Sequence, residues 1–276
     1  MDIGVVGGLI LAVAALLGAD LIDHGSLIAL LNPSAALLII GGTFGATAVS
    51  CGLPDVLALP RLMLLAARPA RIDLPAEIER MVALALKARR SGLLSLEEDI
   101  AQLPDPFVAR GLQMVVDGAD ADTVRSVLGT EMVLQRRAHA RHAQLFETAG
   151  GFAPTMGIIG TVLGLIHVLS NLSSPASLGP SIATAFLATF YGISSANIFW
   201  LPIGNRLQQN GKTASLVAEV GLEGILSIQA GDNPSAVRDK LTVFLHGQPG
   251  RPPEPGGPPS GPARPEDQGE GAHRVA

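Results

Sequence analysis

The residues that could carry chemistry are unusually few in one long stretch of this chain. Thr148 to Asn205 contains no Asp, Glu, Lys or Arg, and its only histidine is His167. The stretch is nevertheless rich in Ser, Thr, Gly and Pro, whereas a passive membrane anchor would be mostly Leu, Ile and Val. Hydroxyl groups and small residues on apolar helices indicate tight packing around an inner face that handles something polar.

Four apolar segments must position these groups. One bilayer crossing needs about 20 apolar residues, so the uncharged stretch predicts two crossings, over about 151–171 and 180–203. The N-terminal region predicts two more, over about 3–20 and 34–53. With 48% hydrophobic residues and a mean hydropathy of +0.40, the composition indicates a multi-pass membrane protein.

The basic residues predict the orientation. All 19 Lys and Arg lie within Arg61–Arg141 or from Arg206 onward. Neither short hairpin loop, Asp20–Pro33 or Ser170–Pro180, carries one. The positive-inside rule therefore places both termini, and the segment between the second and third crossings, in the cytoplasm.

The predicted fold class is an all-α membrane protein, with four transmembrane helices and a helical cytoplasmic domain inserted between the second and third. The predicted units are a transmembrane hairpin (1–53), the cytoplasmic domain (54–147), a second transmembrane hairpin (148–206), further cytoplasmic helices (207–246) and a disordered Pro/Gly-rich tail (247–276). The single cysteine, Cys51, excludes an intramolecular disulfide. The sequence has no strand-like alternation and no nucleic-acid-binding patch.

Helix signals recur in the cytoplasmic domain. Apolar residues at helical spacing predict a helix over Pro75–Arg90, with Gly92 at the position that ends it. The run Ser95-Leu96-Glu97-Glu98 reads as a capping box, which predicts a helix start at Ser95. A longer amphipathic helix is expected over Asp120–Phe146, just before the third crossing.

Small residues form stripes along the predicted crossings. A stripe of small residues lets two helices approach closely in a membrane. The third crossing has Gly157, Gly160 and Gly164, and the fourth has Ala185, Thr189, Gly192 and Ala196. These glycines are the candidate helix-packing residues, and they predict a tightly packed bundle or contacts between subunits.

Apart from Asp20 at the outer boundary of the first crossing, no carboxylate, lysine or arginine lies inside a predicted crossing. Ion-coupled transporters and pumps usually hold an intramembrane acid or base as the ion site. Unless His167 serves as the ion site, two possibilities remain. Either the chain moves no ions, or a partner protein supplies the carboxylate. His167 itself is expected near the outer end of its helix, as a hydrogen-bonded polar residue and not a relay.

Four segments, in this order, resemble the MotA/PomA family, the larger subunit of the bacterial flagellar stator. They are Asn32-Pro33-Ser34 with Gly41-Gly42-Thr43-Phe44-Gly45-Ala46, then Arg89 to Glu98, then Pro154 to Leu165, then Ala188-Thr189-Phe190-Tyr191-Gly192 through Trp200-Leu201-Pro202. Each segment alone is a weak signal, and the combination is specific. The resemblance covers nearly the whole chain up to the tail.

The resemblance implies a function that accounts for the missing acid. In this family, five copies surround two copies of a smaller MotB-like partner, which has one transmembrane helix, an ion-binding aspartate and a peptidoglycan-binding domain. The ring steps around that anchored partner and turns a FliG-type rotor protein. For this chain the resemblance implies a homopentamer in the bacterial inner membrane, without catalytic residues, metal or cofactor, and with H⁺ as the transported ion.

The resemblance also implies roles along the ion path. Pro154 and Pro202 match the two functional prolines of the family. The alternatives are a first-turn helix proline for Pro154 and a kink or helix end for Pro202. Thr161 and Thr189 match hydroxyls that line the path, with a bond to the helix's own carbonyl as the alternative. Ala188 stands where sodium-driven members tend to carry Thr, which favours protons, although Thr161 is also of the sodium type.

The charged set that faces the rotor in this family is matched by Arg89, Arg90, Glu97 and Glu98. The alternative for Glu98 is a place in the capping box that begins at Ser95. Exposed charges interact weakly and are screened by salt. Such a surface suits a contact that must form and release repeatedly.

Three other functions compete with this interpretation. An ExbB/TolQ-type energising subunit has three crossings, whereas four are predicted here. A self-sufficient secondary transporter is disfavoured because no intramembrane charge is present. A membrane scaffold without ion coupling is disfavoured by the small and hydroxyl-bearing helix faces. Tyr191 and Trp200 are expected to act in packing or as interface anchors.

Overall fold

The computed structural model describes residues 3–22, 24, 28–67, 73–171 and 175–246. All regular structure in these residues is helical, which confirms the predicted all-α fold class. Four helices are long and apolar enough to cross a membrane. They are Gly4–Ile22, Pro33–Cys51, part of Ala121–Ser170 and part of Leu178–Gln229. The predicted tail over 247–276 lies outside the described residues.

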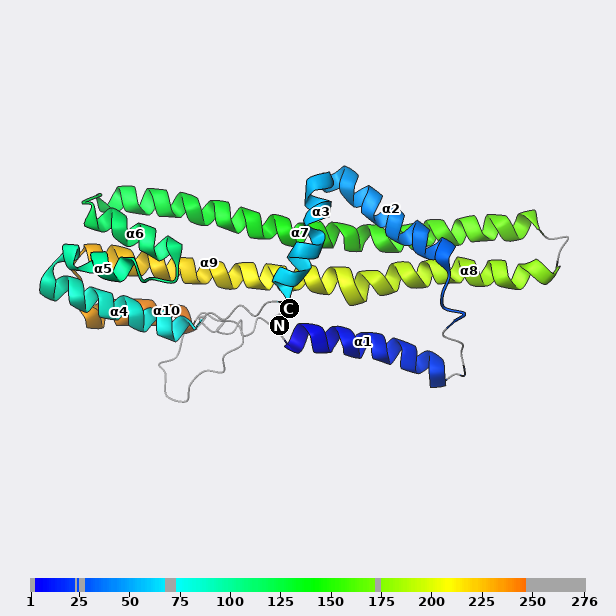
Figure 1. Cartoon of the computed structure of the whole chain (residues 1–276), viewed down its shortest axis with the longest axis horizontal. Coiled ribbons are helices and arrows are strands. Elements are labelled where there is room, and N and C mark those ends of the chain that lie inside the picture. Colours follow the sequence, from blue (N-terminus) through cyan, green and yellow to red (C-terminus); the bar gives the residue numbers. More distant parts are fainter. Residues whose placement is uncertain (1–2, 23, 25–27, 68–72, 172–174, 247–276) are drawn as a thin grey trace, which may run out of the picture.

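Two long helical rods lie side by side along the whole length of the molecule (Figure 1). The first is α7 (Ala121–Ser170), an unbroken helix of 50 residues. The second consists of α8 (Pro175–Ser194), the π-helical turn η2 (Ser195–Trp200) and α9 (Leu201–Gln229). At about 1.5 Å per residue, each rod is long enough to cross the bilayer and continue well beyond it.

The rods correct two sequence expectations. The helix predicted over Asp120–Phe146 and the third crossing are one continuous element, which starts where the Asp120 carboxylate accepts a hydrogen bond from the Thr123 amide at 2.9 Å. The fourth crossing likewise continues into α9 without a break. No glycine or proline at these junctions takes a helix-ending conformation, so the helices persist across the membrane surface.

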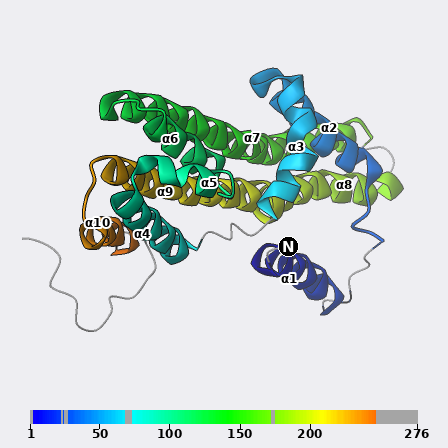
Figure 2. The same cartoon turned by 60° about the vertical axis from the view of Figure 1, so that its left-hand side comes forward.

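The N-terminal helices are arranged unequally around the rods. Helix α2 (Pro33–Cys51) packs on α7 and α8, and its buried residues Ala35, Ile39, Thr43 and Thr47 recur at helical spacing. Gly52, with φ of 94°, then turns the chain into α3 (Leu53–Ala66). Helix α1 (Ile3–Ile22) lies apart from α2 in both views (Figures 1 and 2), and its main contact is with η2.

The cytoplasmic domain wraps short helices around the far ends of α7 and α9. These are α4 (Leu74–Ser91), the 3₁₀ turn η1 (Leu93–Leu96), α5 (Glu97–Ile100), α6 (Pro106–Val116) and α10 (Pro234–His246). Their shared core is apolar and includes the fully buried Met81, Leu96, Leu112, Leu128 and Ile225. Because α7 and α9 also form the membrane rods, this domain is coupled to the bilayer through continuous helices.

A second core lies where the rods leave the membrane segment. Trp200 is its centre, with ring centroids 4.9 Å from Phe199, 5.6 Å from Phe44 and 6.1 Å from Phe146. Beside it, both Arg141 Nε and Nη2 donate to Asp55 Oδ2, at 3.0 and 2.7 Å, and join α7 to α3. These contacts fix the angle at which α3 crosses the rods.

The capping box predicted at Ser95 does not form. Gly92, with φ of 83°, ends α4, and the chain then enters the 3₁₀ turn directly. Ser95 is inside that turn and its hydroxyl donates to the Gly92 carbonyl at 2.7 Å. A capping residue needs an extended backbone in front of its helix, and Ser95 has a helical one. Glu98 is therefore not engaged as a cap.

Candidate functional site

Helices α7 and α8 meet at backbone distance inside the membrane. A Cβ at Gly192 would lie 2.5 Å from the Ala153 carbonyl oxygen, and one at Gly157 would lie 3.1 Å from the Ala188 carbonyl oxygen. A Cβ at Gly164 would lie 2.5 Å from that of Ala185. The glycine stripe therefore occupies the α7–α8 interface and leaves no room for larger side chains there.

Two threonines face each other in this interface. The hydroxyls of Thr161 and Thr189 hydrogen-bond to each other. Thr161 Oγ1 also lies 3.2 Å from the Gly157 carbonyl oxygen and 3.0 Å from that of Ala185, and Thr189 Oγ1 lies 3.4 Å from the Gly157 oxygen. Four oxygen atoms thus converge from two helices. Thr161 therefore makes the bond to a carbonyl of its own helix that was the alternative to a role in the ion path. It also makes contacts across to α8.

Ala188 lies next to this oxygen cluster, and its side chain contributes no polar atom. Its side chain is 2% exposed, and its Cβ would be 2.5 Å from a Cβ at Gly160. Ala35 and Ile39 of α2 belong to the same buried cluster. Position 188 therefore adds a buried methyl group and no side-chain oxygen.

The two predicted prolines lie inside the rods, and this excludes part of their alternative explanations. Pro154 is in the interior of α7, far from its start at Ala121, so it is not a first-turn proline. Pro202 follows the π-helical turn, and α9 continues to Gln229, so it does not end a helix. An interior proline removes one backbone bond and favours a local bend, and π-turns often occur at functional sites.

A hydrogen-bonded network, called the latch below, joins the N-terminal end of α2 to α8. Its residues were not assigned a site role from sequence. Tyr191 donates to the Leu30 carbonyl and accepts from the Asn32 amide at 3.0 Å. Asn32 Nδ2 donates to Thr184 Oγ1 at 2.9 Å, and Ser34 Oγ donates to Asn32 Oδ1 at 2.7 Å. The Asn-Pro pair and the only tyrosine of the chain were the available signals for this network.

The four charged residues predicted to face a rotor lie around one turn. Arg89 and Arg90 are in the last turn of α4, and Glu97 and Glu98 begin α5. All four are exposed, and none forms an ion pair with any other described residue. The turn lies at the end of the cytoplasmic domain farthest from α1 and α2 (Figure 1). These four charges are therefore exposed to solvent and are not paired with opposite charges in the described part of the chain.

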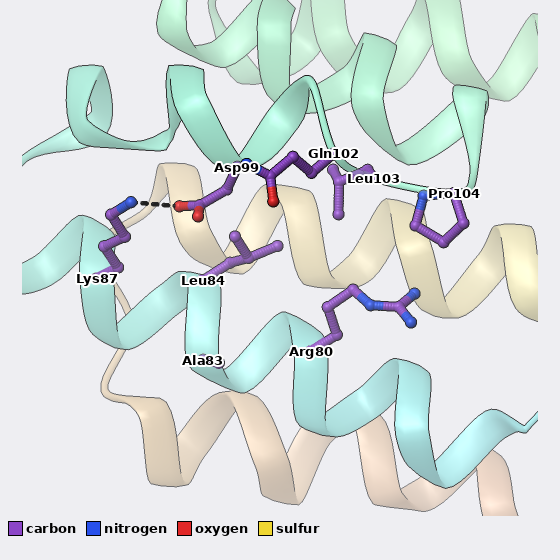
Figure 3. Close-up of a pocket in the computed structure, with 8 residues that line it drawn as sticks. All are labelled: Arg80, Ala83, Leu84, Lys87, Asp99, Gln102, Leu103 and Pro104. Carbon is purple, nitrogen blue, oxygen red and sulfur yellow. Dashed lines mark hydrogen bonds and ion pairs between the residues drawn. The ribbon is translucent and has the colours of Figure 1, made fainter.

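An ion pair holds α5 in place beside α4. Lys87 Nζ donates to Asp99 Oδ2 at 2.6 Å, at one end of a groove of about 300 Å³ that is lined by Leu84 on the α4 side and by Leu103 on the opposite side (Figure 3). Further along α4, burial raises the pKa of the Glu77 carboxyl, and the adjacent Arg80 opposes that rise. This carboxyl belongs to the domain core and not to the exposed charged turn.

The described residues provide no metal centre. No group of three or more His, Cys, Asp or Glu side chains gathers among them in a way that could hold a metal ion.

Known proteins share this sequence and this architecture. Residues 99–219 match the MotA/TolQ/ExbB proton channel family. Motility protein A of Bacillus subtilis is 35% identical over 239 residues, which cover 86% of this chain and 88% of the relative. The MotAB structure from C. jejuni superposes with a TM-score of 0.84 at 28% identity, over 90% of this chain and 98% of that one.

A second solved structure gives the same result. The flagellar MotAB stator complex from Bacillus subtilis superposes with a TM-score of 0.80 at 34% identity, over 87% of this chain and 94% of that chain. Sequence and architecture therefore agree across both membrane hairpins and the cytoplasmic domain. The resemblance inferred from four short segments is confirmed: this chain belongs to the motility protein A branch of the MotA/TolQ/ExbB proton channel family.

Proposed function

We propose that this chain is the ring-forming subunit of a flagellar stator, which couples proton flow across the inner membrane to torque on a rotor. The observation that carries the proposal is the oxygen cluster at Thr161 and Thr189, set in a membrane segment that has no charged residue. Such a cluster can accept or pass a proton, but it has no group that holds one at neutral pH. A partner must supply that group.

The partner in this proposal is a MotB-like subunit with one transmembrane helix and an aspartate. Its carboxylate would lie against the α7–α8 face of each of several ring subunits, with five as the expected number. Neutralising a carboxylate in an apolar environment removes its desolvation cost, so the protonated and charged forms prefer different positions against the ring. That preference drives a step.

The ion is a proton in this proposal. A hard metal cation such as Ca²⁺ takes about six to eight oxygen ligands. This cluster offers only two hydroxyls and two carbonyls, and both hydroxyls lie near the same Gly157 carbonyl oxygen. The adjacent position is Ala188, whose methyl side chain adds no oxygen ligand. Swimming speed should therefore be independent of external sodium and should fall to zero with a protonophore. A speed that follows sodium would overturn this part.

Torque leaves the subunit through the charged turn. Arg89, Arg90 and Glu97 are exposed and unpaired within the described chain, and Glu98 joins them because it has no capping role. The rods α7 and α9 carry movement from the membrane to this end. The contact partner is a FliG-type rotor protein with complementary charge.

In this proposal both termini lie in the cytoplasm, on the side of the Lys- and Arg-rich domain. The ExbB/TolQ alternative is disfavoured because four described helices can span the membrane and those subunits cross three times. A self-sufficient transporter is disfavoured by the charge-free membrane segment. The stator remains the function that best fits both the hydroxyl cluster and the cytoplasmic extension.

The test removes the hydroxyls and keeps the shape. Thr161→Val and Thr189→Val should each reduce swimming speed and proton flux strongly, because valine is nearly isosteric with threonine but cannot bond. Thr155→Val is the matched control, since Thr155 is exposed on the same helix and donates only to the Phe152 carbonyl. Equal motility in all three variants, at equal membrane abundance, would exclude the cluster from the ion path.

A further inference from the structure

A cavity of about 390 Å³ lies where α2, α7 and α8 meet, beside the oxygen cluster. Its polar lining comes from helix ends that share one side of the membrane. Ser34 is in the first turn of α2, His167 is in the last turn of α7, and Ser181 and Thr184 are in the first half of α8. That side is opposite the Lys- and Arg-rich domain, so it is the outer side.

Hydrogen bonds hold the polar residues at the rim of this cavity in place. Asn32 accepts a hydrogen bond from Ser34 and donates one to Thr184, whose own hydroxyl donates to the Pro180 carbonyl at 3.0 Å. Tyr191 holds the backbone on either side of this point through Leu30 and Asn32. The latch therefore orients two hydroxyls at the mouth of the cavity.

His167 differs from these rim residues. Its ring makes no hydrogen bond with any described residue, and the residue is exposed. It is also the only histidine in a stretch that contains no Asp, Glu, Lys or Arg. Any charge placed at this position is thus felt without a nearby compensating charge on the membrane-spanning parts of α7 and α8.

The cavity lining includes sequence neighbours of the threonine pair, although neither threonine itself lines it. Its floor is formed by small residues, including Gly160 and Ala188, which directly precede Thr161 and Thr189 in the sequence. The floor residues are thus the sequence neighbours of the oxygen cluster on both helices.

We propose that this cavity is the outer vestibule of the ion path, in which water carries the cation to the threonine pair, and that the side chain at position 167 sets the potential at its mouth. The inference rests on the proposed function, because it assumes that the threonine pair lies on the path. It adds a site, a ligand class (a hydrated small cation or hydronium) and a residue that controls access.

The proposal predicts opposite effects on ion flux for positive and negative side chains at position 167. In a medium of low effective dielectric constant, a unit positive charge beside the path raises the energy of a passing cation, and a negative charge lowers it. Lysine at 167 should therefore hinder flux, a neutral amide should have little effect, and aspartate should maintain or increase it. A purely structural role would make lysine and aspartate similarly harmful.

The experiment is a charge series in cells that produce this chain together with its partner subunit. Proton uptake and swimming speed are measured for His167→Lys, His167→Gln and His167→Asp, at membrane abundance matched by immunoblotting. We expect a roughly tenfold or greater loss for lysine, because in a medium of low effective dielectric constant a unit charge beside the path repels a passing cation by several times the thermal energy, and wild-type flux or more for aspartate. Equal loss for lysine and aspartate would overturn the proposal.

The matched controls are Leu169→Lys and Leu169→Asp. Leu169 is 67% exposed near the same end of α7 and does not line the cavity, so both control variants should retain flux. Control variants that repeat the charge series would show a general surface effect and overturn the vestibule. Loss of flux in Thr189→Val together with a flat series at 167 would leave the proposed function standing and remove only the vestibule.

Discussion

The α7–α8 interface and the α4–α5 turn are built on opposite principles, although the rods connect them. In the interface, side chains are reduced to hydrogen or methyl so that two backbones meet, and the paired threonine hydroxyls bond to each other. In the turn, four long charged side chains extend into solvent without partners among the described residues. The interface therefore excludes large side chains, whereas the turn exposes charged ones to solvent.

This difference separates stability from function in a testable way. Where backbones touch, an added methyl group must displace a neighbour, and overpacking destabilises. Where charges are exposed, a substitution changes the free energy of unfolding little. Substitutions that add atoms where α7 and α8 touch should therefore disturb folding and activity together, whereas substitutions at the turn should affect activity alone. The expected change in stability thus decreases from the membrane interface to the turn.

The largest effect is expected for Gly192→Ala. Its new Cβ would lie 2.5 Å from the Ala153 carbonyl oxygen, which belongs to rigid backbone, so the helices must separate. We expect a loss of about 1–3 kcal/mol and reduced motility. Thermal unfolding of the purified subunit, followed by circular dichroism, measures the change. Gly151→Ala is the control, since a Cβ at that position would have no neighbour within 4 Å and the variant should be neutral or stabilising.

The close contact at Gly192 also shows what could be read from sequence. Spacing of small residues predicted which faces pack, because that pattern follows from helix geometry alone. It could not show that Gly192 meets the Ala153 carbonyl and not a side chain, since that depends on the register of α8 against α7. The continuity of α7 was missed for a similar reason, because the sequence marks the membrane boundary by charge and the helix passes through it.

The candidate site was predicted unevenly, and for identifiable reasons. The matches at Thr161, Thr189 and the prolines came from family resemblance, and hydrophobic periodicity alone would not have paired the two threonines. The latch of Asn32, Thr184 and Tyr191 was missed because it joins residues about 150 positions apart. The capping box at Ser95 failed because Gly92 ends α4 in a way that commits the next residues to a 3₁₀ turn.

An intermediate effect is expected for Glu77→Gln in the cytoplasmic core. Burial raises the pKa of Glu77 above its ordinary value of 4.5, with Arg80 opposing and Asp105 reinforcing the rise. A raised pKa in the folded state means that folding favours the protonated form. The resulting stabilisation is complete below the unfolded-state pKa and is lost as pH rises through the folded-state pKa.

Glutamine removes this pH dependence because it cannot ionise. The variant should therefore be more stable than the wild type at pH 7, and the difference should shrink as the pH falls towards 4. Melting temperatures measured at several pH values test this. Glu79→Gln is the control, since Glu79 is exposed and pairs only with Arg238 at the surface. A stability gain that does not change with pH would contradict the assignment.

A small effect is expected for the ion pair beside the groove. Lys87→Met breaks its bond to Asp99 while keeping the aliphatic stem, and both partners are more than a third exposed. Exposed pairs contribute about 0–1 kcal/mol, so the melting temperature should change little. Motility should nevertheless fall in part, because α5 and its two glutamates lose one anchor to α4. Unchanged motility would show that η1 alone positions α5.

The smallest effect on stability belongs to the charged turn itself. Arg89→Glu with Arg90→Glu should leave membrane insertion unchanged and shift the free energy of unfolding by less than about 0.5 kcal/mol, as is usual for exposed positions away from special features. Swimming should stop while proton uptake continues, because the reversed charges meet a rotor surface selected for the opposite sign. Arg137→Glu is the control, an exposed arginine on α7 that is unpaired among the described residues and distant from the turn in sequence. Loss of insertion in the double variant would instead make these arginines structural, and the two regions would no longer differ in kind.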